Sequence, residues 1–203
     1  MEQIIQLNSG AKLSPHFTLG EMTTSNHKEV YNIPSHEAIA NLKRLCGWLE
    51  VLRKRYNESI HPAPNPAPHM GGEYTIPSTP LLMGGGEFTA HRIPLLVGGG
   101  DGGGGDKARL QPIIINSGYR SPQLNKKIGG APTSNHLTGC AADIRVSGME
   151  QAIRYAAILL DYSQESHQEF DELLIERNRY GAIWVHFAVR PSNNRRKISF
   201  IQT

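Results

Sequence analysis

The sequence has few of the features that mark a secreted, disulfide-stabilised or membrane-bound protein. Its two cysteines, Cys46 and Cys140, lie in different kinds of segment, so neither a disulfide framework nor a CxxC zinc pattern follows. No stretch approaches the roughly 18 apolar residues of a membrane span. Residues 1–7 lack the positive segment and long apolar stretch of a secretion signal. We therefore expect a soluble protein with no signal peptide, cytoplasmic when made.

The chain also carries only a small net charge. The formal net charge is +3, and the basic residues are scattered apart from one short cluster at residues 195–197. A nucleic-acid partner usually requires a basic patch or stripe. We expect no nucleic-acid partner and no membrane span.

The chain is long enough for one good core, because 203 residues with 38% hydrophobic content fit a single domain. We expect one domain over residues 1–203, interrupted by an insertion at about 61–106. The insertion begins proline-rich, ends in polyglycine and repeats with a period of 14, so that GEYT at 72–75 aligns with GEFT at 86–89. A structureless loop of this length is uncommon inside a compact domain. It is either an engineered or grafted segment or a natural loop that binds a protein partner.

Outside the insertion, the pattern predicts an α+β fold. Apolar residues recur at spacings of three and four residues over residues 35–56, which indicates a long amphipathic helix. Capping boxes at Thr18 with Glu21 and at Ser147 with Glu150 predict a short helix and a helix reaching about Leu160. Strands are expected near residues 112–115 and at 170–176, 182–189 and 197–202. The predicted architecture is a small, largely antiparallel sheet with helices packed on one side.

The most informative segment is residues 134–143, SNHLTGCAAD, which places His136 and Asp143 seven apart. His186 stands far downstream in an apolar run. Two imidazoles and one carboxylate make a three-ligand zinc site that leaves a fourth place for water, the pattern of a catalytic site. Another interpretation stays open: His136 and Asp143 could be ordinary loop residues, and His186 could be a core histidine whose ring is hydrogen-bonded within the protein.

Several motifs together resemble a known family. These are SGYRS at 117–121, the Ser-x-His-x-x-Gly-x-Ala-x-Asp pattern at 134–143, FDELLIE at 170–176, WVH at 184–186 and LSPHFTL at 13–19. The chain resembles the zinc D-alanyl-D-alanine carboxypeptidase-type peptidases, in particular their small single-domain branch in phages and bacteria. This group shares its metal fold with the hedgehog signalling domain. The resemblance covers nearly everything except residues 61–106.

The resemblance implies a role for each matching residue. His136, Asp143 and His186 would bind zinc, and Arg120 would bind substrate beside the metal and assist catalysis. Ser134 is a second substrate-binding candidate, although its hydroxyl can also hydrogen-bond within its own loop. The implied reaction is zinc-dependent hydrolysis of a peptide bond in the peptidoglycan stem peptide, by a carboxypeptidase or an endopeptidase. Such an enzyme would reach the cell wall after lysis or by another export route.

The general base is the point of departure from the family. Several relatives place a glutamate three residues before the last histidine, where this chain has Ile183. Glu176 matches the glutamate of the small-domain branch, and Asp171 and Glu172 are weaker candidates. If no carboxylate acts as the general base, the alternative is a catalytically weak or inactive zinc-bound binding module, as hedgehog relatives show for this fold. Such a module could be a scaffold that displays the two Pro-Leu-Leu segments of the insertion.

Overall fold

The computed structural model describes residues 9–61 and 110–202. Its elements, in chain order, are α1 (Leu19–Thr23), α2 (His36–Ile60), β1 (Ile115–Ser117), α3 (Pro122–Lys127), η1 (Asn135–Thr138), β2 (Ala141–Arg145), α4 (Met149–Ser166), β3 (Glu172–Arg177), β4 (Ile183–Ala188) and β5 (Lys197–Gln202). The α+β prediction is confirmed. The predicted insertion, including both Pro-Leu-Leu segments, lies outside the described residues except for His61.

The strands form one five-stranded sheet in the order β1-β2-β4-β3-β5. Neighbouring strands run antiparallel except for β3 and β5, which are parallel. The central register aligns Asp143 of β2 with His186 of β4, and His186 with Leu174 of β3. Because successive side chains of a strand point to opposite faces, this register puts Asp143 and His186 on the same face.

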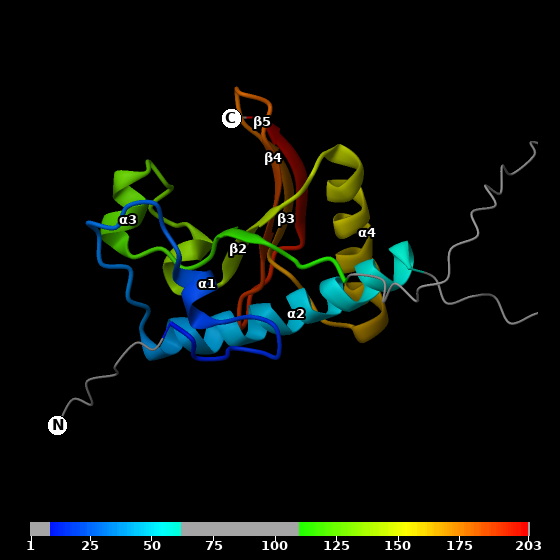
Figure 1. The fold of residues 1–203 in the computed structure, drawn as a ribbon, viewed down its shortest axis with the longest axis horizontal. Helices are drawn as coiled ribbons and strands as arrows, with labels where there is room; N and C mark the ends of the chain where they lie inside the picture. Colours follow the sequence, from blue (N-terminus) through cyan, green and yellow to red (C-terminus); the bar gives the residue numbers. More distant parts are fainter. Residues whose placement is uncertain (1–8, 62–109, 203) are drawn as a thin grey trace, which may run out of the picture. The chain divides into compact units, whose positions relative to one another are not determined.

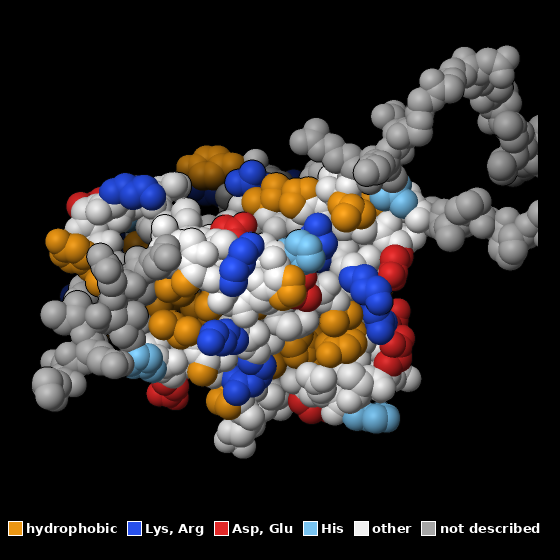
Figure 2. All heavy atoms as spheres, turned by 60° about the horizontal axis from the view of Figure 1, so that its bottom comes forward, with side chains coloured by type: hydrophobic (Ala, Val, Ile, Leu, Met, Phe, Trp, Pro, Cys, Tyr) orange, Lys and Arg blue, Asp and Glu red, His pale blue; other side chains and the backbone are white. Residues whose placement is uncertain are grey.

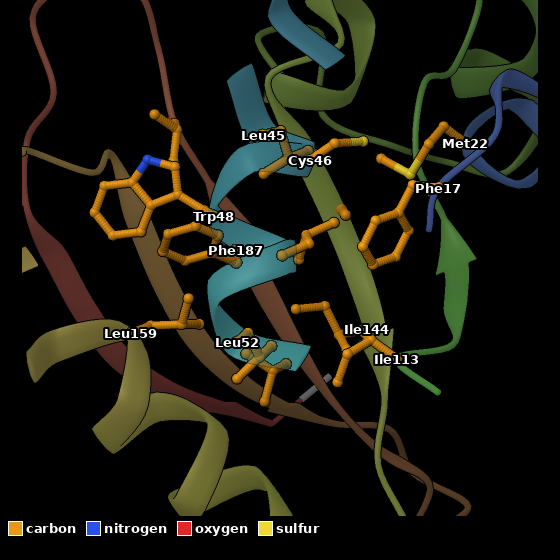
Figure 3. Packing of buried hydrophobic residues seen from close by; sticks show 14 of the residues in the cluster. Phe17, Met22, Leu45, Cys46, Trp48, Leu52, Ile113, Ile144, Leu159 and Phe187 are labelled. Atoms are coloured by element: carbon orange, nitrogen blue, oxygen red, sulfur yellow. The ribbon is translucent and has the colours of Figure 1, made fainter. Parts of the chain in front are cut away.

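The other face of the sheet packs against the two long helices. Ile144, Val185 and Phe187 point into a core shared with α2 and α4. The ring of Trp48 on α2 lies 5.3 Å from that of Phe187, between centroids, and Figure 3 shows the two rings together with Leu52 and Leu159. Figure 1 shows α4 on one side of the upright strands and the short α3 on the other. The predicted layering is thus confirmed for the long helices.

The helix starts follow local capping chemistry. Thr18 and Glu21 form the predicted capping box, with both reciprocal hydrogen bonds present. Ser35 caps α2, because its hydroxyl accepts from the Ala38 N–H. The capping box predicted at Ser147 is wrong: α4 begins after Gly148 with no side-chain cap. No helix in the described ranges is both long and apolar enough to cross a membrane.

The outward side of α2 and its C-terminal end are polar. In the view of Figure 2, Lys and Arg side chains are spread among acidic and apolar ones rather than gathered.

Near the end of α2, the Asn57 side chain accepts from the Gln111 N–H at 2.6 Å and donates to the Gln111 carbonyl at 3.0 Å. This pair of bonds joins the two chain segments that flank residues 62–109.

Candidate metal centre

His136 is held rigidly on the short helix η1. The Ser134 hydroxyl caps this helix by accepting from the His136 N–H at 3.3 Å, and Gly139 ends it with φ of 71°. A side chain at Gly139 would place its Cβ 2.5 Å from the Ala38 carbonyl oxygen, so only glycine fits. The buried His136 ring places Nδ1 2.6 Å from the Gly118 carbonyl, which accepts its N–H. Its Nε2 lone pair therefore faces Asp143.

Asp143 and His186 complete the cluster from neighbouring strands. Asp143 Oδ1 lies 3.3 Å from His136 Nε2 and 2.9 Å from His186 Nδ1. One donor atom from each of the three residues lies within 4.8 Å of the other two. The structure thus brings together all three residues predicted to bind the metal.

The donor set fits zinc. Ligand atoms about 2.0–2.2 Å from a tetrahedral zinc lie roughly 3.3 Å from one another, close to the two separations to Asp143. The two rings use different nitrogens, Nε2 in His136 and Nδ1 in His186. A carbonyl acceptor behind His136 is the usual outer contact of a metal-binding histidine.

The charges in the cluster are strongly coupled. Burial alone would raise the pKa of Asp143, but the neighbouring His136 and His186 rings hold that pKa well below its usual range. Burial lowers the pKa of His136. Burial opposes the charged form of His186 too, yet the adjacent carboxylates of Asp143 and Glu172 raise its pKa to about 9. A metal ion binds only a neutral imidazole, so protons and metal compete for these rings.

Arg120 lies beside this cluster, in the segment after β1. Its NH2 group contacts Asp143 Oδ2 at 2.5 Å, and its Nε donates to the Ser117 hydroxyl at 2.8 Å. Its side chain is only 15% exposed. Arg120 thus holds the outer carboxylate oxygen of the candidate ligand Asp143, a contact that the sequence did not predict. Its expected contact with substrate remains a prediction.

Ser134 is placed differently from the three ligands. Besides capping η1, it lines a cavity of about 350 Å³ together with Thr138, Arg190 and Asn193. The ligands His136, Asp143 and His186 are not among the residues that line this cavity. The substrate-binding role of Ser134 remains a prediction.

Glu176 lies on the same sheet face as Asp143 and His186. It pairs with Trp184, two positions before His186 on β4. The long turn after β3 does not disturb this register, because the Asn178 side chain accepts from the Tyr180 and Ala182 N–H groups. Burial raises the pKa of Glu176, and the charge of His186 opposes that rise. A carboxylate with a raised pKa beside metal ligands is a candidate general base.

The weaker base candidates, Asp171 and Glu172, are engaged elsewhere. Asp171 is fully buried, with Arg195 on both of its oxygens at 2.9 and 2.6 Å and Arg190 at 3.0 Å. Glu172 lies behind His186, with Oε2 3.4 Å from Nε2. The adjacent His186 ring is the main reason that the pKa of Glu172 falls to about 2, although burial opposes it. Neither carboxylate is poised to accept a proton.

Comparison with known proteins agrees with this geometry. A family model described as Peptidase M15 matches residues 106–186. That range holds Arg120, His136, Asp143, Glu176 and His186. A search of curated proteins found no match.

The match supports the resemblance at the level of this metallopeptidase family, which includes D-alanyl-D-alanine carboxypeptidases. Peptidases of the family depend on zinc. Together with the clustered ligands His136, Asp143 and His186, the match confirms the prediction of a zinc cofactor.

Proposed function

We propose that this protein is a zinc-dependent hydrolase of peptide bonds in the peptidoglycan stem peptide. The observation that carries the proposal is the convergence of His136 Nε2, Asp143 Oδ1 and His186 Nδ1 on one sheet face. Glu176 stands on the neighbouring strand of that face. The Peptidase M15 match supports the peptidase activity, and the wall substrate follows from the motif resemblance.

The proposed mechanism divides the work between the metal and the chain. When bound, zinc supplies a Lewis acid that polarises the scissile carbonyl and makes the attacking water more acidic. Glu176 accepts the proton of that water and passes it to the leaving amine. Its raised pKa brings it closer to the pKa range in which a carboxylate can both take and return a proton.

Arg120 contributes fixed positive charge. The guanidinium has five N–H donors, and two of its nitrogens already contact Ser117 and Asp143. In the proposal, its remaining N–H groups bind the terminal carboxylate of the substrate or the developing oxyanion. Ser134 is a second candidate for substrate binding.

A non-catalytic, zinc-bound binding module is the second candidate function. Ile183 favours it, because several relatives carry a glutamate at that position and this chain has no carboxylate there. The partner of such a module would be a wall fragment or, through residues 61–106, another protein.

Mass spectrometry of muropeptides digested by the zinc-loaded protein tests the proposal. Loss of a terminal D-alanine identifies a carboxypeptidase, and new amino groups within cross-links identify an endopeptidase. Stoichiometric zinc without cleavage of any wall peptide would favour the binding module instead.

A further inference from the structure

The two histidines of the metal cluster are held from behind by different acceptors. His136 donates its outer N–H to the Gly118 carbonyl at 2.6 Å. His186 points the opposite nitrogen, Nδ1, at Asp143, so its Nε2 faces away from the cluster. This Nε2 is buried and makes no regular hydrogen bond within the described part of the chain.

A buried N–H group needs an acceptor, and the structure offers one. Oε2 of Glu172 lies 3.4 Å from His186 Nε2, slightly beyond ordinary hydrogen-bond length. Glu172 and His186 come from adjacent strands of the same sheet, where Glu172 pairs with Ala188. Both side chains are largely buried, at 14% and 9% exposure.

The Glu172 carboxylate is itself fixed by donors on every side. The Asn135 amide donates to Oε2 at 2.9 Å, while Arg195 and Lys197 approach Oε1 at 2.9 and 3.4 Å. Asn135 cannot turn its amide round, because its oxygen accepts from Arg190 Nε at 2.8 Å. Glu172 is therefore held as an anion that can accept from His186 but cannot swing toward a substrate.

We propose that Glu172 is a positioning residue, which accepts the Nε2–H of His186 and so presents the Nδ1 lone pair to the metal. Carboxylates in this outer position fix the tautomer and ring orientation of a metal-binding histidine. Asn135, which directly precedes His136 in the chain, helps to hold Glu172 in this place by donating its amide N–H to Oε2. The inference rests on the proposed zinc site.

Zinc affinity of the full-length protein, measured by competition with a fluorescent chelator, tests this role. Glu172→Ala should weaken zinc binding by about 10–100-fold, the range found for outer-shell partners of metal ligands. Glu169→Gln is the matched control, since Glu169 lies three residues away, is 60% exposed and should leave zinc affinity unchanged. Glu172→Gln retains an oxygen acceptor, so it should bind zinc more tightly than Glu172→Ala.

A spectroscopic measurement separates positioning from a general loss of structure. Long-range proton–nitrogen NMR spectra of the zinc-loaded parent should show His186 protonated at Nε2 and His136 protonated at Nδ1. In Glu172→Ala at saturating zinc, the His186 signals should broaden or shift while those of His136 remain. Parent-like zinc affinity and parent-like His186 signals in Glu172→Ala would overturn the inference while leaving the zinc site intact. A parent protein that binds no zinc would instead overturn the proposed function.

Discussion

Asp143 and His186 face each other across β2 and β4, and a single carboxylate oxygen lies 2.9 Å from the Nδ1 atom of the imidazole. The same oxygen lies 3.3 Å from Nε2 of His136, which arrives from η1 rather than from the sheet. The register of β2 with β4 therefore places Asp143 opposite His186. The third residue of the cluster, His136, lies on η1, the short helix that ends at Gly139. The ligand geometry follows from backbone features that tolerate little change.

The general base can be identified by an isosteric substitution. Glu176→Gln should retain the fold and zinc but lower kcat by about 10² or more, the scale of general-base catalysis. The measurement is muropeptide turnover at saturating zinc, with zinc content determined on the same sample. Glu150→Gln serves as the control, because Glu150 is 82% exposed and lies on α4. Full activity in Glu176→Gln would move the base to another residue.

Replacing Arg120 should lower catalytic efficiency without abolishing zinc binding. Arg120→Met removes the contact with Asp143 Oδ2 and the proposed contact with substrate, so kcat/KM should fall by about 10–100-fold. Zinc should still bind stoichiometrically when in excess, because all three ligands remain. Arg145→Met tests the loss of a nearby arginine that contacts Asn116 rather than Asp143. Equal activity losses in both variants would argue against a specific role for Arg120.

The insertion at residues 61–106 should be dispensable for folding and for zinc binding. Asn57 and Gln111 already hold the flanking segments together, so a linker of about six residues can span them. Shortening the connection roughly eightfold should favour folding by about 2 kcal/mol, at about 0.6 kcal/mol per doubling of its length. Thermal unfolding and zinc stoichiometry of the shortened protein provide the test. A shortened protein that fails to fold or loses zinc would show that the segment is structural.

The N-terminal loop should carry a pH-dependent part of the stability. Glu50 on α2 accepts from the Ser14 hydroxyl at 2.6 Å and from the His16 backbone N–H at 2.8 Å. Burial opposes ionisation of Glu50, but these hydrogen bonds hold its pKa below the ordinary 4.5. Glu50→Gln should therefore lower the free energy of unfolding at pH 7 by about 1–2 kcal/mol.

The sign of the pH effect follows from the lowered pKa. The stabilisation by Glu50 is present above the unfolded-state value of 4.5 and is lost as pH falls through the lower folded-state value. Chemical denaturation of the parent and Glu50→Gln should therefore give curves that converge as pH falls below about 4. Glu58→Gln, at an exposed position on the same helix, is the control. A difference that stays constant with pH would contradict this assignment.

Local sequence signals predicted most elements, and they predicted the three residues that the structure brings together as a candidate metal cluster. The motif at 134–143 is short and specific, so His136 and Asp143 could be identified without long-range information. The helix predicted at 35–56 is α2, and the strand predicted at 197–202 matches β5. The strand predicted near residues 112–115 is β1, which is short and begins at Ile115. The short elements α3 and η1 were not predicted, because six- and four-residue helices leave little periodicity.

The supporting contacts could not be predicted, because they join residues far apart in the chain. Asn135 reaches Glu172 and Arg190 across separations of 37 and 55 residues. The pairing of Arg120 with Asp143 depends on where the segment after β1 crosses the sheet edge. Glu172 looked like a candidate base in the sequence, and only the register of β3 with β4 shows it behind His186.

Zinc stoichiometry, measured by elemental analysis of the parent and of a His136→Ala, Asp143→Ala, His186→Ala triple variant, tests the central claim most directly. The account predicts one zinc per chain in the parent, none in the triple variant, and lower stability in the variant because metal binding adds to the folding free energy. Stoichiometric zinc in the folded triple variant would contradict it.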